Sequence, residues 1–218
     1  MRIKLEYIGI FFVYSVLILN VCIMHDSFIA FLSALCGITY TLLAGKGNPL
    51  CYLIGLCGSA FYIYLAFINN FWGNCLLYSL YFLPMQVIGF FRWNKNLKEG
   101  KYEIIKTSVT RKENISLLLI TSLISVVMIF VFAKSGDSNP VADSLTTVFS
   151  ILGMYYTVRR AIEQWFIWAG VNFVALIMWV IIAIQGEKVY STVLMWFVYF
   201  ILALYFYFSW KKELSEKS

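Results

Sequence analysis

Two stretches of the sequence, DSFIAFLSALCGITYT at 26–41 and DSLTTVFSILGMYYT at 143–157, begin with the same dipeptide and lie 117 residues apart. A serine, a glycine and a Tyr-Thr pair then occur at matching positions, with the register slipping by one residue partway. Self-similarity at a long, fixed separation is typical of internally repeated folds. The two stretches therefore predict that the chain contains two copies of one structural unit.

The similarity extends beyond these stretches on their C-terminal side. A short basic turn follows each stretch, and an aromatic segment comes next, YLIG at 52–55 and WFIW at 165–168. Both units then end in a similar tetrapeptide, RWNK at 92–95 and SWKK at 209–212. Each unit is therefore predicted to contain three apolar segments.

The composition is that of a helical integral membrane protein. Hydrophobic residues make up 61% of the chain, charged residues make up 13%, and the mean hydropathy is +0.80. Most of the apolar runs approach the roughly 20 residues that cross a bilayer as a helix. No small-residue cleavage site follows the first run, which we therefore interpret as a retained segment and not as a signal peptide. Eight runs are predicted to cross: Tyr7–Met24, Phe28–Ala44, Leu50–Ile68, Trp72–Phe91, Ile115–Ala133, Leu145–Val158, Trp165–Ile184 and Val189–Ser209.

The basic residues predict the topology. If all eight runs cross and the N-terminus is cytoplasmic, 15 of the 17 Lys and Arg residues lie on the inner side, all except Lys134 and Lys188. This is the positive-inside pattern, so both termini are predicted to be cytoplasmic. The largest inner loop, Asn94–Asn114, is interpreted as a solvated loop that sets the topology, with binding of a partner or of anionic membrane lipid as the alternative. The topology also accounts for the net charge of +6, so no nucleic-acid partner is expected.

The repeat and the topology together predict the fold. Both units run from outside to inside, and because three crossings is an odd number, the additional crossing Ile115–Ala133 must return the chain between them. We predict an all-α integral membrane fold of 3+1+3 helices with two parallel triple-helix repeats, preceded by one N-terminal membrane segment. Parallel repeats of this kind occur in transporters, including the SWEET-like sugar carriers. The predicted regions are the N-terminal segment 1–25, the first repeat 26–93, the basic loop 94–114, the linker helix 115–133 and the second repeat 142–212.

The segment EQWFIWAGVNF, at 163–173, suggests a binding site. Trp165, Trp168 and Asn172 recur at i, i+3 and i+7, so on a helix they share one stripe about 10 Å long. An asparagine inside an apolar segment cannot face lipid without leaving its amide unpaired, so it faces protein or a cavity. Two indoles beside a carboxamide suit a flat, polar heteroaromatic ligand, including a cationic one. The alternatives are an interfacial aromatic belt for Trp165 and interhelical packing for Asn172.

Other polar residues within or at the ends of the apolar segments complete the predicted substrate-binding set: Gln86, Asn48, Tyr155 and Thr147. Gln86 follows Pro84, which removes one backbone hydrogen bond and frees the carbonyl of Leu80. A bend at this point would form a gate or a binding notch. A kink satisfied by neighbouring helices is an equally good interpretation.

Several classes of protein are disfavoured by what the apolar segments lack. No Asp, Glu, Lys or Arg lies in the middle of a segment, as a proton-coupled carrier generally requires, and no phosphate-binding glycine loop of an ATPase is present. His25 has no neighbouring ligands and the five cysteines form no CxxC pair, so neither a metal site nor a cofactor is expected. No catalytic constellation indicates an enzyme. Facilitated diffusion is then the simplest mechanism, and net accumulation would require chemical trapping of the substrate.

Three motifs resemble the PnuC family of bacterial vitamin transporters, and the resemblance covers roughly Ser27 to Trp210. They are KGN at 46–48 with YLIG at 52–55, LYFLPMQVIGFFRW at 80–93, and WxxWxxxN at 165–172. The last motif resembles the one that marks the nicotinamide riboside branch of the family. The N-terminal segment is a departure from family members with fewer spans.

The resemblance implies uptake of nicotinamide riboside down its gradient across the bacterial inner membrane, with trapping through phosphorylation by a cytoplasmic riboside kinase. It implies that Trp165 and Trp168 pack on the nicotinamide ring and that Asn172 bonds the amide or the ribose. Gln86 and Asn48 are then expected to contact hydroxyl groups. The alternatives are thiamine or another flat vitamin precursor as the substrate and, in a different class, a non-transporting membrane enzyme or a structural subunit. The sequence also leaves a homo-oligomer open.

Overall fold

The computed structural model describes residues 11, 14–15, 18–19, 28–68, 72–136, 139–186 and 190–216. The predicted all-α class is confirmed within these ranges. The segment predicted at Tyr7–Met24 lies almost entirely outside them, as do His25 and Lys188. The helices are α2 (Phe28–Gly45), α3 (Cys51–Ile68), α4 (Trp72–Leu77), the π-helix η1 (Tyr78–Phe82), α5 (Leu83–Asn94), α6 (Arg111–Lys134), α7 (Pro140–Val158), α8 (Glu163–Ile184) and α9 (Tyr190–Ser215).

Most helix ends lie within three residues of the predicted apolar runs, and three helices extend further. α6 begins four residues before Ile115 because Thr110 caps it, the Thr110 hydroxyl accepting a hydrogen bond from the Glu113 N–H at 3.3 Å. α7 begins five residues before its predicted start, at Pro140, since proline is well suited to the first turn of a helix. α9 continues past its apolar run to Ser215.

The helices have the length and surface of membrane spans. α6 exposes an apolar face on which Leu119, Leu123 and Phe130 are each 64 to 67% exposed. Such a face is stable against lipid hydrocarbon and not against water. A shorter apolar helix occupies Phe31–Gly45. Within the described ranges, the helices long and apolar enough to cross a membrane are Cys51–Ile68, Cys75–Asn94, Arg111–Lys134, Glu163–Ile184 and Thr192–Ser215.

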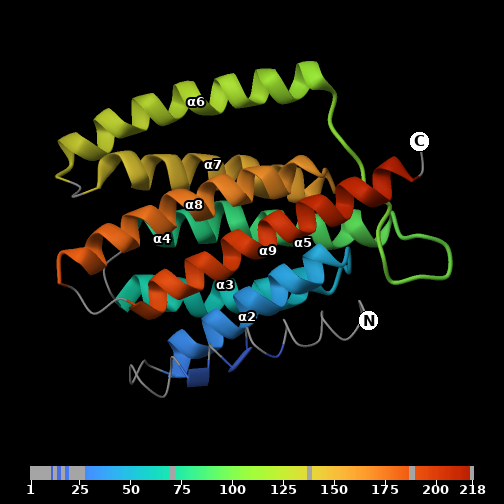
Figure 1. Cartoon of the computed structure of the whole chain (residues 1–218), viewed down its shortest axis with the longest axis horizontal. Helices are drawn as coiled ribbons and strands as arrows, with labels where there is room; N and C mark the ends of the chain where they lie inside the picture. The colour runs from blue at the N-terminus through green and yellow to red at the C-terminus, as the bar shows by residue number, and fades with distance from the viewer. Residues whose placement is uncertain are drawn as a thin grey trace.

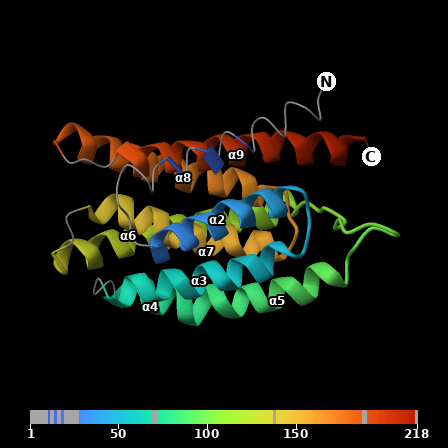
Figure 2. The same cartoon turned by 90° about the horizontal axis from the view of Figure 1, so that it is seen from below.

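Six helical units form a closed ring. Each packs against the next in the order α2, α3, α4–η1–α5, α7, α8, α9 and again α2. The helices run alongside one another over the length of the molecule (Figures 1 and 2). α6 stands outside the ring, packs against α7 and lies at the edge of the molecule in Figure 1. Side chains from all six units can therefore meet in the interior of the ring.

The third unit of the ring contains a π-helical turn just before Pro84. The Leu83 N–H donates to the carbonyl of Tyr78, five residues earlier in the chain. In an α-helix the acceptor would be the carbonyl four residues earlier. Such turns inside longer helices are frequent at functional sites. Tyr78 and Phe82 of this turn line the cavity described below. Where the sequence predicted a bend near Pro84, the structure has a widened helical turn.

The loop between α5 and α6 crosses one end of the ring, and we call its residues 95–110 the strap. The strap's Ile104 N–H donates to the carbonyl of Gly47 at 2.9 Å. Its Thr107 N–H donates to the carbonyl of Arg160 at 3.0 Å. Gly47 and Arg160 occupy the turns that follow α2 and α7, and both have positive φ, at 72° and 63°. The strap therefore binds the turn after the first helix of each predicted repeat.

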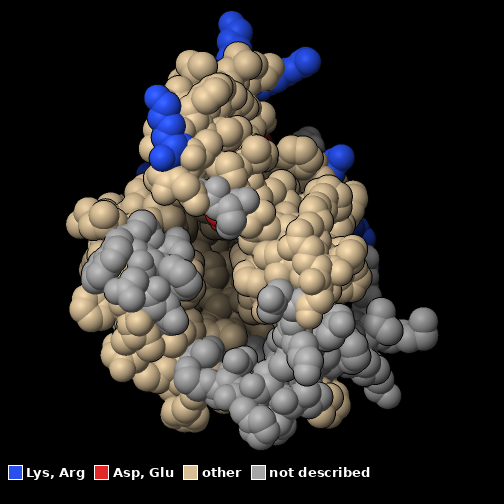
Figure 3. Space-filling view, turned by 90° about the vertical axis from the view of Figure 1, so that its left-hand side faces the viewer, with Lys and Arg blue, Asp and Glu red and all other residues tan. Residues whose placement is uncertain are grey.

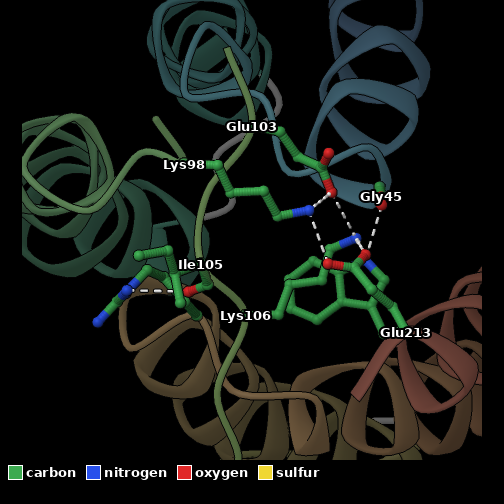
Figure 4. A network of polar contacts seen from close by, with 8 residues as sticks. Gly45, Lys98, Glu103, Ile105, Lys106 and Glu213 are labelled. Carbon is green, nitrogen blue, oxygen red and sulfur yellow. Dashed lines mark hydrogen bonds and ion pairs between the residues drawn. The ribbon is translucent and has the colours of Figure 1, made fainter. Parts of the chain in front are cut away.

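Salt bridges join the strap to the end of α9 (Figure 4). Lys98 lies 2.7 Å from Glu213 and 2.5 Å from Glu103. Lys106 pairs with the same two carboxylates, and its ammonium group lies 5.1 Å from the ring centroid of Trp210. Burial alone would lower the pKa of Lys98, but its hydrogen bonds to the two carboxylates raise it. Lys106 is only 8% exposed, so this part of the strap packs against the helices, whereas other parts of the strap are exposed to solvent.

Candidate functional site

A cavity of about 470 Å³ lies inside the ring and is lined by residues of α2, α3, η1, α5, α7, α8 and α9. Its lining includes Ser33, Leu65 and Met195, which lie toward the end where α6 turns into α7. Figure 3 views this end and shows the surface hollowed between two groups of side chains. The cavity therefore extends toward the end of the molecule opposite to the strap.

The cavity wall is aromatic, polar and uncharged. Its aromatic side chains are Tyr40, Tyr62, Tyr78, Phe82, Trp165, Trp168, Trp196 and Tyr199. Its polar side chains are Ser33, Thr41, Ser59, Gln86, Thr157, Gln164 and Asn172. None of the described lining residues is Asp, Glu, His, Lys or Arg. Such a wall favours a flat ligand that is neutral or cationic, because aromatic faces attract cations and no basic group is present to neutralise an anion.

Trp165, Trp168 and Asn172 all line the cavity from one stripe of α8. Trp165 is 3% exposed, and its ring packs against Phe206 and Trp210 at centroid distances of 5.1 and 5.7 Å. The indole N–H of Trp165 has no hydrogen-bond partner among the described residues. A buried donor left unpaired costs about 1–3 kcal/mol. This N–H is therefore well suited to bind an acceptor on a ligand.

The indole of Trp168 is held by the protein on two sides. Its N–H donates to Thr157 Oγ1 at 3.1 Å. Its ring lies over Gly153, where a Cβ atom would come within 2.9 Å of ring atom Cε2. Any residue larger than glycine at this position would push the ring from its place. Since the N–H of Trp168 is already bonded, the part that this side chain offers to a ligand is its ring surface.

Gln86 carries a second unpaired polar atom. Its side chain reaches from α5 to α3, where Nε2 donates to Ser59 Oγ at 2.7 Å. Although Gln86 is only 5% exposed, its Oε1 accepts no hydrogen bond from the part of the chain that the structure describes. Two residues that line the cavity thus each hold a buried polar atom that lacks a partner, an acceptor in Gln86 and a donor in Trp165.

Two tryptophans seal the strap end of the ring by reciprocal contacts. The N–H of Trp93, at the end of α5, donates to the carbonyl of Thr157 at 2.9 Å. The N–H of Trp210, on α9, donates to the carbonyl of Gly45 at the end of α2, at 2.7 Å. Trp93 stands edge-on to Tyr52, with centroids 5.0 Å apart, and Trp210 makes the same edge-on contact with the first tryptophan of α8. Both indoles are fully buried, so the cavity is closed at this end.

The sequence matches the family model described as nicotinamide mononucleotide transporter over residues 27–212. It is 30% identical over 191 residues to the nicotinamide riboside transporter PnuC of Haemophilus influenzae, which covers 86% of this chain and 80% of that relative. The chain belongs to the PnuC family of transporters. This PnuC-family chain is also 28% identical over 203 residues to the nicotinamide riboside transporter PnuC of Neisseria mucosa, covering 88% of this chain and 75% of that relative. A crystal structure of the vitamin B3 transporter PnuC is similar to it with a TM-score of 0.78 and 25% identity, covering 97% of this chain and 93% of that one.

These comparisons confirm the resemblance that the sequence motifs predicted. The PnuC family consists of transporters and not of enzymes, and the described helices include five that are fit to cross a membrane. The chain is therefore a multi-pass membrane transporter of this family.

Four of the seven side chains predicted to bind substrate in this PnuC-family chain meet in the cavity, namely Trp165, Trp168, Asn172 and Gln86. Asn48 lies instead in the turn before α3, where its Oδ1 accepts a hydrogen bond from the Leu50 N–H at 2.9 Å. The hydroxyl of Tyr155 accepts a hydrogen bond from Arg159 at 2.9 Å, and its ring faces the same guanidinium group at 5.5 Å.

Thr147 is also not among the described lining residues. It lies on the same side of α7 as Met154, which does line the cavity, but about two turns closer to the hollowed end.

The sequence motifs of the PnuC family did not indicate the tyrosines of the wall, which are Tyr40, Tyr62, Tyr78 and Tyr199. Tyr40 belongs to the repeated Tyr-Thr pair, so the repeat itself was a usable signal. Its counterpart Tyr156, however, donates a hydrogen bond to Asn114 of α6 at 2.8 Å. The remaining tyrosines lie in aromatic-rich segments whose spacing does not distinguish a cavity wall from packing.

Proposed function

We propose that this chain mediates facilitated uptake of nicotinamide riboside. One observation carries the proposal: Trp168, Trp165 and Gln86 line one uncharged cavity, and the last two each hold a buried polar atom that lacks a partner in the described part of the chain. Nicotinamide riboside has a flat pyridinium ring, a carboxamide and ribose hydroxyl groups. The cationic ring is suited to stack on an indole, while Asn172 and the two unpaired atoms can bond its polar groups. The names of the two curated relatives support the same substrate.

The cavity favours the riboside over the mononucleotide that the family description names. The two compounds differ by one phosphate group, which carries a charge of about −1.5 to −2 at neutral pH. Proteins usually bind phosphate through Arg, Lys or clustered N–H groups. The described lining contains no basic side chain, and burial of an unmatched charge costs several kcal/mol. We therefore expect the mononucleotide to be excluded.

The proposal includes the SWEET-like 3+1+3 arrangement. In it, residues 26–93 form the first triple-helix repeat, residues 142–212 form the second, and α6 is the linker helix between them. The reciprocal hydrogen bonds of Trp93 and Trp210 support this arrangement, because each joins the last helix of one repeat to the first helix of the other. The strap's matching bonds to the two turns support it in the same way. The substrate would then bind between the repeats.

The distribution of basic residues supports an orientation with the strap and both chain ends in the cytoplasm. In this orientation the cavity is closed toward the cytoplasm and extends toward the outside. Release into the cell would require the contacts of Trp93 and Trp210 to separate. Phosphorylation by a cytoplasmic riboside kinase would then trap the product, since its new phosphate group finds no partner in the cavity.

The experiment that tests the proposal is calorimetric titration of the detergent-purified protein with nicotinamide riboside, nicotinamide mononucleotide and thiamine. We expect saturable binding of the riboside alone. Asn172→Ala should weaken it about tenfold or more, because a buried ligand group loses its partner. Asn114→Ala, the same change outside the cavity, is the matched control. Binding of thiamine alone would refute the substrate, and binding of none of the three by folded protein would refute the site.

A further inference from the structure

We propose that Thr157 is a positioning residue that holds the indole of Trp168 as the stacking surface for the substrate; this inference rests on the proposed function. Thr157 lies in the last turn of α7 and is 1% exposed. Its Oγ1 accepts the Trp168 N–H at 3.1 Å and donates to the carbonyl of Gly153 at 2.8 Å. Its own carbonyl accepts the N–H of Trp93 at 2.9 Å.

The chemistry of these groups fixes the direction of each bond. An indole N–H can only donate, so the Thr157 hydroxyl must act as the acceptor for Trp168. The single hydroxyl proton is then directed to the carbonyl of Gly153, which can only accept. In this assignment the hydroxyl uses both its acceptor and its donor capacity. The hydroxyl is therefore held in one orientation, and it holds the polar edge of the indole in turn.

Gly153 determines the remaining freedom of the ring. It lies one helical turn before Thr157, and the Trp168 ring packs against it so closely that a Cβ atom would be 2.9 Å from Cε2 and 3.1 Å from Cζ2. The glycine sets how far the ring approaches α7, and the hydroxyl sets which way its N–H points. Together they fix the plane on which a flat ligand would stack.

The hydrogen bond from Trp93 ties this arrangement to the sealed end of the ring. It joins the main chain of Thr157, on α7, to the end of α5. One buried residue therefore supports both the stacking surface and the contact that closes the strap end.

The test compares four variants by calorimetric titration with nicotinamide riboside. Thr157→Val keeps the shape and removes the acceptor, and we expect a Kd about five- to tenfold weaker than wild type. Thr157→Ser restores the hydroxyl and should return the Kd to within about twofold. Trp168→Phe keeps a ring and removes the N–H, and the double variant with Thr157→Val should bind no more weakly than Trp168→Phe alone, because both changes remove the same bond.

Thr146→Val is the matched control, since Thr146 lies on the same helix, donates to the carbonyl of Ala142 at 2.8 Å and is outside the described lining. Its Kd should not change. A wild-type Kd in Thr157→Val, or additive losses in the double variant, would overturn the positioning role while leaving the proposed function intact. If Thr157→Val does not fold, a wild-type Kd in Trp168→Phe would overturn it as well. Absence of riboside binding by the wild-type protein would overturn the proposed function, and this inference with it.

Discussion

Replacing Trp165 with phenylalanine removes a buried indole N–H that lacks a partner in the described part of the chain, and it keeps an aromatic ring against Phe206 and Trp210. Two effects on stability then oppose each other. Loss of the unpaired donor relieves a cost of about 1–3 kcal/mol, and the smaller ring loses packing of the order of 1–2 kcal/mol. The net change in stability then lies between a loss of about 1 kcal/mol and a gain of about 2 kcal/mol. At about 2–4 °C per kcal/mol for a chain of this size, we expect the Tm to fall by no more than about 4 °C and to rise by no more than about 8 °C.

Nothing offsets the loss of this N–H in binding. If it donates to the substrate, Trp165→Phe removes a hydrogen bond worth about 0.5–1.5 kcal/mol and weakens the Kd for nicotinamide riboside by up to about tenfold. Calorimetric titration gives the Kd, and thermal unfolding in detergent gives the Tm.

Trp210→Phe provides the comparison for stability. The N–H of Trp210 is bonded to the carbonyl of Gly45 at 2.7 Å, so its removal leaves a buried acceptor unpaired. We expect Trp210→Phe to have the lower Tm of the two variants by several degrees. A Trp165→Phe protein with wild-type affinity would refute the assignment of this N–H to the substrate. Equal loss of Tm in both variants would refute the argument that the N–H is unpaired.

Three further predictions concern the cavity. Gly153→Ala should displace the ring of Trp168, because the new Cβ would lie 2.9 Å from it. The affinity for the riboside should then fall about tenfold, and an unchanged Kd in the calorimetric titration would contradict this. Gln86→Leu should weaken riboside binding more than Ser59→Ala does, because only Gln86→Leu removes the unpaired Oε1. Competition binding measures both effects, and equal effects would show that this oxygen does not contact the substrate. Uptake into proteoliposomes should be constant between about pH 6 and pH 8, because no described lining residue titrates in that range, and a sigmoidal rate profile would indicate an ionisable group in the pathway.

The helices could be predicted from the sequence because a bilayer imposes simple rules. A membrane-spanning backbone must pair its own polar groups, so each span appears as a long apolar run with polar ends. Asn172 was readable for the same reason, since one amide inside an apolar segment needs a protein partner or a cavity. The π-helical turn before Pro84 could not be predicted from the sequence, because a proline indicates a local disturbance of the helix and does not specify its geometry.

Residues with two common roles were the least predictable. Asn48 is a polar residue at the end of an apolar run, which fits a ligand contact and a helix cap equally, and the structure shows it bonded in the turn before α3. The salt bridges of Lys98 and Lys106 could not be predicted, because their partner Glu213 lies more than a hundred residues later in the chain. Tyrosines such as Tyr62 serve equally in packing and in cavity walls, so pattern alone could not select them.

The uncharged cavity has an electrical consequence. If the described lining contributes no charge and the substrate is a permanent cation, each transport cycle moves one net positive charge across the bilayer. The membrane potential then acts on transport directly, with about 2.3 kcal/mol per elementary charge at 100 mV. Because 1.4 kcal/mol corresponds to a factor of ten, this equals roughly a 50-fold concentration ratio at equilibrium. A cell with a negative interior would therefore concentrate nicotinamide riboside before any kinase acts, so chemical trapping, which we expected to be required, would only add to this accumulation. The cell would lose the gain on depolarisation.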